Sequence, residues 1–149
     1  MTINVQEATV DDIGFFLSMG RDFAILADEP FDRESLTQHL EWLLDHESAV
    51  MFLAVDVEGK PVGICAGLCF PTFWDHSKIT ATEMWWYVDP EARNAGIGGA
   101  LMDALESWAR DAGAWRLSMM TIAGIAPGVE EMYKHRGYNI REKTFIKEL

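Results

Sequence analysis

Residues 85–101 read WWYVDPEARNAGIGGAL, and this stretch decides the fold. Aromatic and β-branched residues typical of a strand end at Val88, a short loop follows, and glycines open an amphipathic helix. The first turn of a helix exposes unpaired N–H groups and the positive end of the helix dipole, and glycine lets an anion approach the backbone. Arg93 adds a planar set of donors that suits phosphate oxygens. The stretch therefore predicts an anion-binding turn between a strand and a helix.

Two common phosphate-binding patterns do not fit this turn. A nucleoside-triphosphate loop ends in Gly-Lys-Ser/Thr, a tripeptide that the chain lacks. The dinucleotide pattern G-x-G-x-x-G needs a third glycine where Leu101 stands, and it follows a first strand. A glycine turn that only allows close helix packing is the alternative interpretation.

The apolar periodicity on either side of this turn predicts the other elements. Strands are expected at 2–8, 50–57, 62–70, 79–88, 115–122 and 138–148, and helices at 13–27, 33–46, 96–111 and shortly after Pro127. The order is β-α-α-β-β-β-α-β-α-β. It predicts an α/β (α+β) fold with a mixed, mostly antiparallel central sheet and helices on both faces. We expect one domain over residues 1–149.

The composition limits the classes of function. The 149 residues are 49% hydrophobic and 24% charged, which is typical of a globular chain, and the net charge is −12. Phosphate and anionic-lipid surfaces need basic patches, so we expect no nucleic acid and no membrane partner, while cationic ligands are favoured. No apolar run approaches the length of a membrane helix and the first residues show no signal-peptide pattern, so a cytoplasmic location is expected. Cys65 and Cys69 are too far apart along one strand to form a disulfide, which predicts free buried thiols.

Two segments resemble the GNAT acyltransferase family. They are the sequence Arg93-x-x-Gly96-x-Gly98 after the strand, and Tyr133-x-x-x-Gly137-Tyr138 near the end of the chain. The resemblance implies a GNAT-like fold, with acetyl-CoA as cosubstrate in a cleft where the fourth and fifth strands separate. It also implies which backbone groups bind this cosubstrate. Tyr87 and Val88 would pair with the pantetheine arm, and the diphosphate would be held by Arg93, Asn94, Ala95, Gly96, Gly98 and Gly99.

The same resemblance implies an N-acetyltransferase with two catalytic side chains. Tyr133 occupies the position of the general acid that protonates the leaving thiolate, and a backbone N–H near Val88 would stabilise the oxyanion. Glu83 is the candidate base, and strand alternation would place it on one face with Trp85 and Tyr87. A solvated strand glutamate and a core tyrosine are the alternative interpretations.

The acceptor side rests on two loops, at 26–32 and 71–76, that combine aromatic and acidic residues. Such a lining suits a small cationic amine, through charge pairing and cation–π contact. The candidate residues are Asp28, Glu29, Phe31, Phe73 and Trp74. Two solvated loops with incidental aromatic residues remain the alternative. The four histidines are dispersed without metal-ligand spacing, so no metal site is expected.

Two other functions stay open on the sequence. One is a catalytically silent acyl-CoA-binding module that regulates a partner, because residues 123–128 lack the asparagine often found there in the family. The other is an interaction protein. Six tryptophans and eight methionines are more than one small core needs, which leaves a homodimer open.

Overall fold

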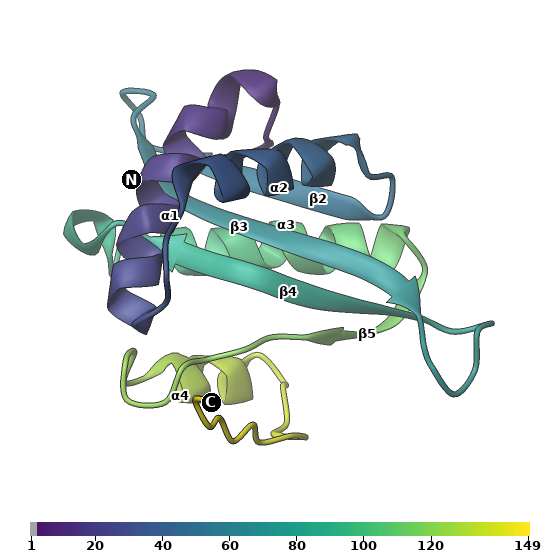
Figure 1. The fold of residues 1–149 in the computed structure, drawn as a ribbon. Coiled ribbons are helices and arrows are strands. Elements are labelled where there is room, and N and C mark those ends of the chain that lie inside the picture. The colour runs from purple at the N-terminus through teal and green to yellow at the C-terminus, as the bar shows by residue number, and fades with distance from the viewer. Residues whose placement is uncertain (1–2) are drawn as a thin grey trace.

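The computed structural model describes residues 3–149. Thr2, expected to begin the first strand, lies outside the described residues. Figure 1 shows the elements, which in chain order are β1 (Asn4–Glu7), η1 (Val10–Asp12), α1 (Ile13–Ala27), α2 (Arg33–Asp45), β2 (Ala49–Val55), β3 (Pro61–Pro71), β4 (Ile79–Val88), η2 (Pro90–Ala92), α3 (Ile97–Asp111), β5 (Ala114–Ser118) and α4 (Val129–His135).

The described strands form one five-stranded sheet in the order β1-β2-β3-β4-β5. The first four strands pair antiparallel, and β5 pairs parallel to β4. A parallel pair needs a crossover connection, and α3 supplies it. The predicted mixed, mostly antiparallel sheet is confirmed.

Helices cover both faces of the sheet (Figure 1). On one face, Phe16 and Leu17 of α1 and Leu40 and Leu43 of α2 are buried against the sheet. On the other face, α3 carries the apolar stripe that the sequence predicts, of which Ile97, Leu101 and Leu105 are buried against β2 and β3. The last two members of the predicted stripe differ, since Trp108 is half-buried and Ala112 is exposed. The approach of α3 is close: a Cβ at Gly67 would lie 2.5 Å from the Leu105 side chain.

The chain after α4 corrects one predicted element, because residues 138–149 form no strand. Ile140, Phe145 and Ile146 are exposed by 65%, 92% and 85%, so these apolar side chains stay largely in solvent. Three consecutive charged residues at 141–143 interrupt the alternation that a half-buried strand needs. The observed order therefore ends at α4, one strand short of the expectation.

A β-bulge in β4 corrects a second expectation. Ala66 of β3 pairs with Trp85 and Gly67 pairs with Glu83, so Met84 has no partner. Residues opposite one another in a ladder share a face, and Gly67 faces α3. Glu83 therefore faces the α3 side, whereas Trp85 and Tyr87 pack with the α1 and α2 side. The alternation argument was wrong because the extra residue reverses the faces at this point.

The two cysteines are buried and free, as predicted. Burial raises the pKa of the Cys65 thiol, which keeps it protonated. None of the helices in residues 3–149 is long and apolar enough to cross a membrane. No group of three potential metal ligands lies together in the same residues.

Candidate active site

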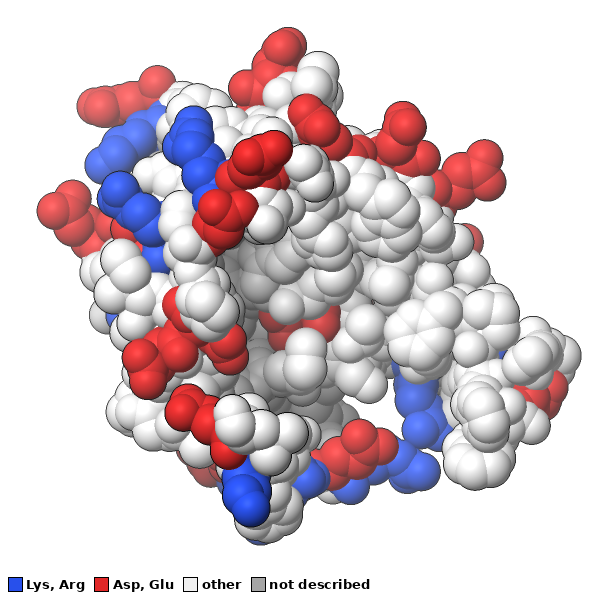
Figure 2. All heavy atoms as spheres, viewed as in Figure 1, with Lys and Arg blue, Asp and Glu red and all other residues white. Residues whose placement is uncertain are grey.

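The site begins where β4 and β5 separate. The two strands pair from Ile79 to Thr82 of β4, with Thr82 opposite Ser118 at the end of β5. The next residue of β4 is Glu83, and β4 continues to Val88 without β5 beside it. Figure 2 shows a hollow on the face of the molecule turned to the viewer. It lies between the region of α1 and α2 above and the region of α4 below, and acidic atoms are visible in its floor. The predicted separation of the fourth and fifth strands is thus present.

Glu83 lies at the point of separation and is only 4% exposed. The backbone N–H of Met120 donates to its carboxylate, with 3.0 Å between N and Oε2. Burial raises the pKa of Glu83 to about 7, although the Met120 N–H favours the charged form. A solvated strand glutamate does not describe this residue, and its pKa suits proton transfer near neutral pH.

Tyr133 reaches the same peptide segment from α4. The side chain is 8% exposed, and its hydroxyl donates to the Met120 carbonyl at 2.8 Å. The ring of Tyr133 lies 6.1 Å from that of Trp86 and 5.7 Å from that of Tyr138. Burial, with the charge of Glu83 next, raises the pKa of Tyr133, so the phenol keeps its proton. The two predicted catalytic side chains therefore meet at the backbone of Met120, a residue that the sequence did not single out.

The glycine turn leads from the other end of β4 into α3. Asp89 caps η2 by accepting from the Glu91 N–H at 3.0 Å, and Asn94 and Gly96 take left-handed conformations with φ of 68° and 81°. No side chain caps α3, whose first helical bond runs from the Ala100 N–H to the Gly96 carbonyl. The amides of Ile97, Gly98 and Gly99 thus have no acceptor in the helix.

The space around this turn fits an anion at two of the three glycines. A Cβ at Gly96 or Gly99 would meet no heavy atom closer than 3.9 Å. A Cβ at Gly98 would lie 2.6 Å from the Trp86 ring, so this glycine also serves packing, as the alternative interpretation of the turn expected. The indole N–H of Trp86 is buried and has no partner among residues 3–149. The uncapped amides and the open glycines together suit the diphosphate of a coenzyme.

Arg93 and Tyr87 flank the turn in ways that the sequence did not show. The Arg93 Nε donates to the Val88 carbonyl at 3.2 Å, and its guanidinium lies 5.9 Å from the centre of the Tyr87 ring. The Tyr87 side chain is 8% exposed and packs toward α1, where Phe23 meets it edge to face at 6.4 Å. It lines a pocket of about 280 Å³ together with Asp22 and Asp89. The Tyr87 side chain thus lies on the α1 side of the sheet and not between β4 and β5.

The five predicted acceptor residues are not brought into one pocket. Asp28 and Glu29 are exposed and Phe31 is half-buried, in the loop between α1 and α2. Phe73 and Trp74 are 82% and 90% exposed, with their rings 4.9 Å apart. Figure 1 places the two loops at opposite ends of β4. None of the five lines the pocket beside Tyr87.

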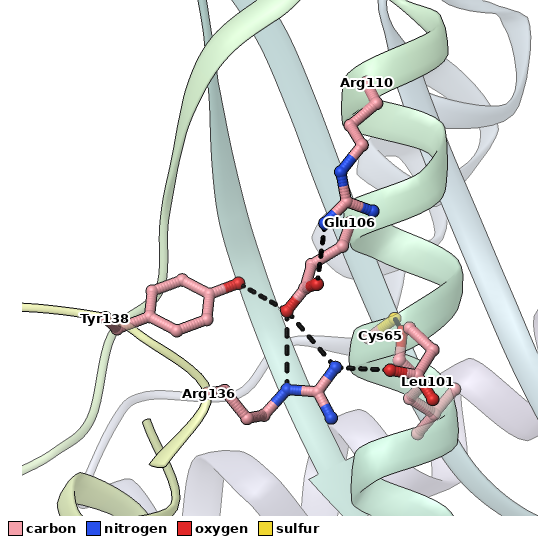
Figure 3. A network of polar contacts seen from close by, with 7 residues as sticks. Cys65, Leu101, Glu106, Arg110, Arg136 and Tyr138 are labelled. Atoms are coloured by element: carbon pink, nitrogen blue, oxygen red, sulfur yellow. Dashed lines mark hydrogen bonds and ion pairs between the residues drawn. The ribbon is translucent and has the colours of Figure 1, made fainter. Parts of the chain in front are cut away.

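A polar network between α3 and α4 went unpredicted (Figure 3). Glu106 of α3 accepts from Arg136 at 3.2 Å and 3.4 Å and from the Tyr138 hydroxyl at 3.0 Å, while Arg110 pairs with its other oxygen at 3.2 Å. Asp103 also pairs with Arg136. The three-residue spacing of Asp103 and Glu106 was a local signal that both lie on one helix face, but their partners stand about thirty positions later, beyond any periodicity.

Comparison with known proteins identifies the family. Residues 16–138 match the model of the Acetyltransferase (GNAT) family. The chain is 32% identical over 121 residues to an aminoglycoside N(6′)-acetyltransferase type 1 of Stenotrophomonas maltophilia, covering 76% of this chain and 72% of that protein. The chain therefore belongs to the GNAT acetyltransferase family.

Solved structures of the same fold include two that hold the coenzyme or an analogue. AAC(6′)-Iy, in complex with the bisubstrate analogue CoA-S-monomethyl-acetylneamine, has a TM-score of 0.82 at 12% identity, over 100% of this chain and 99% of that one. A predicted acetyltransferase from Clostridium acetobutylicum, solved with acetyl-CoA, has a TM-score of 0.78 at 18% identity, over 99% and 96%. These likenesses confirm the predicted GNAT fold.

Proposed function

We propose that the protein is an N-acetyltransferase that moves an acetyl group from acetyl-CoA to an amine. The observation that carries the proposal is the meeting of Glu83 and Tyr133 at Met120, at the point where β4 leaves β5. One group has a pKa near 7 and the other stays protonated, which is the pairing that base and acid roles require. The uncapped start of α3 lies at the other end of the open part of β4.

Acetyl-CoA would supply a thioester as the acetyl donor. The amides of residues 93–99 would hold its diphosphate, and the backbone of Tyr87 and Val88 would align the pantetheine arm along the edge of β4 that β5 leaves open. Repulsion by a net charge of −12 acts at long range, so local donors must dominate at contact. The fit of the turn to an anion supports the diphosphate contacts, and the resemblance to the GNAT family implies the alignment of the pantetheine arm.

The reaction needs three proton movements. Glu83 takes a proton from the acceptor ammonium, directly or through water, so that the amine can attack the thioester carbonyl. A backbone N–H near Val88 stabilises the oxyanion. After the C–N bond has formed, the C–S bond breaks and the Tyr133 hydroxyl gives its proton to the leaving thiolate. The second proton of the attacking nitrogen leaves as the amide forms and returns to the Tyr133 oxygen, directly or through water.

We propose a small cationic amine as the acceptor. Acidic side chains lie in the floor of the hollow and along its left side in Figure 2, and the chain carries twice as many acidic as basic residues. The 32% identical relative is by name an aminoglycoside acetyltransferase, and aminoglycosides belong to the class of cationic amines. The proposed contacts lie in two loops at opposite ends of β4, with Asp28, Glu29 and Phe31 in one and Phe73 and Trp74 in the other, so a small amine would contact one of these loops at a time.

A catalytically silent acyl-CoA-binding module is the second candidate. The observation in its favour is that Glu83 and Tyr133 both already have backbone partners on Met120. Turnover requires that each gives up its partner or shares it, whereas binding alone does not.

A coenzyme A release assay with polyamine, aminoglycoside and amino-acid amine acceptors separates the two candidates. Thiol release that depends on a cationic amine supports the enzyme. Calorimetric binding of acetyl-CoA without thiol release from any amine supports the silent module, and release only with neutral or acidic acceptors contradicts the proposed acceptor class. Absence of binding contradicts both functions.

A further inference from the structure

Arg136 stands at the C-terminal end of α4, and two carboxylates of α3 hold its guanidinium. Its Nε and Nη2 donate to Oε1 of Glu106 at 3.4 Å and 3.2 Å, and Nη2 also donates to Asp103. Only 25% of the side chain is exposed. Two nitrogens of the guanidinium thus have fixed partners, and the side chain is held in one orientation (Figure 3).

The third nitrogen, Nη1, has no partner among residues 3–149 and points toward the start of α3 (Figure 3). It is the nearest atom to a Cβ built on Gly99, at 3.9 Å. Gly99 is one of the residues whose amides lack an acceptor in the first turn of the helix. A cationic donor next to α4 therefore lies beside Gly99, one of the residues with an uncapped amide at the start of α3.

We propose that Arg136 is a binding residue for the diphosphate of the coenzyme, to which Nη1 donates above Gly99. The inference rests on the proposed function, because it concerns the same site. Arginine at this position supplies a charge-assisted hydrogen bond that the backbone amides alone do not. The diphosphate is then held between the amides of α3 on one side and the guanidinium from α4 on the other.

Asp103 and Glu106 make this arrangement effective. A long side chain loses conformational freedom when it binds a ligand, and these carboxylates have already removed that freedom. Arg110 pairs with the second oxygen of Glu106, so the charges of the two carboxylates and the two arginines cancel. An incoming diphosphate therefore does not meet a net negative cluster. Arg93, whose Nε is bound to Val88, is not needed for this contact.

The test compares Arg136→Met with Arg110→Met. Both variants remove one arginine partner of Glu106, but Arg110 is 72% exposed and lies beyond Glu106 from the start of the helix. We expect the calorimetric Kd for coenzyme A to rise about 10-fold or more in Arg136→Met, since a hydrogen bond to a charged group is lost, and to change less than about twofold in Arg110→Met. Arg136→Lys, which keeps the charge, should fall between wild type and Arg136→Met.

An acetyl donor that lacks the diphosphate distinguishes a loss of diphosphate binding from a general structural defect. With S-acetylpantetheine, kcat/KM of Arg136→Met should equal that of wild type, whereas with acetyl-CoA it should fall as the affinity does. Equal losses with both donors, or an unchanged Kd for coenzyme A in Arg136→Met, overturn this inference while the proposed function stands. Failure of wild type to bind coenzyme A overturns both. Should Arg136→Met not fold, wild-type affinity in Arg136→Lys overturns the inference.

Discussion

The two ends of the open part of β4 differ in what they offer a ligand. Near Glu83 the functional groups are buried side chains, and after Val88 the chain enters a turn with unpaired backbone amides. Glu83 and Tyr133 are 4% and 8% exposed, and each has a partner on Met120. The amides at the start of α3 have neither a side-chain cap nor a helical acceptor. Burial is the largest cause of the raised pKa of both side chains, whereas groups that bind an anion must stay accessible. Glu83 of β4, with Tyr133 of α4, thus forms the buried proton-transfer point, and the turn that follows β4 forms the accessible binding point.

The sharpest way to break this comparison is to remove the charge at the buried point. Glu83→Gln keeps an oxygen to accept from the Met120 N–H but loses basicity, so kcat/KM should fall about 100-fold. In wild type, kcat/KM should rise with pH through about 7 as Glu83 ionises, and the variant should lack this rise. Steady-state kinetics over pH measure both, with the exposed Glu58→Gln as control. An unchanged pH profile in Glu83→Gln would remove Glu83 as the base.

The charged form of Glu83 should also destabilise the folded protein. The pKa of Glu83 is about 7 in the folded protein against 4.5 for the free group, so the folded state holds this proton more tightly. The free energy of unfolding should therefore fall as pH rises from about 4.5 to about 7 and level off above. Glu83→Gln should be more stable than wild type at pH 8 by about 1–3 kcal/mol. Urea unfolding of both proteins at pH 5 and pH 8 tests this, and equal stability at pH 8 would contradict the raised pKa.

Tyr133→Phe tests the acid at the same point. Turnover should drop more than about 10-fold while the Kd for coenzyme A stays near that of wild type, because the hydroxyl faces Met120 and not the turn. Tyr138→Phe is the matched control, since it loses a hydroxyl of a neighbouring tyrosine that bonds Glu106 instead. Equal turnover in wild type and Tyr133→Phe would exclude Tyr133 from proton transfer.

A substitution in the turn after β4 should give the smallest change in function. Gly96 and Gly113 flank α3 with φ of 81° and 78°, so an alanine at either is strained, at about 1 kcal/mol of stability. Only Gly96→Ala should weaken coenzyme A binding, by about fivefold, because only Gly96 belongs to the turn. Thermal unfolding and calorimetry on both variants separate the two effects. Equal affinities in the two variants would mean that the turn does not bind the diphosphate.

The sequence by itself determined the elements that depend on local geometry. Periodicity located the helices within one residue at 13–27 and 96–111, and the glycines after Val88 predicted an uncapped helix start. The stripe of α3 predicted its buried face. These features follow from residues within a few positions of one another, so neighbouring side chains suffice to specify them.

Only the tertiary structure decided the contacts between segments that are far apart in the sequence. The bulge at Met84 set the face of Glu83, and Met120 united Glu83 with Tyr133. The network of α3 placed Arg136 above Gly99, and the segment after residue 138 did not join the sheet as its pattern predicted. Each of these outcomes depends on how segments distant in the chain pack together, so the local pattern does not contain it. The face of Glu83 shows this most clearly, because a one-residue shift in strand register reverses it.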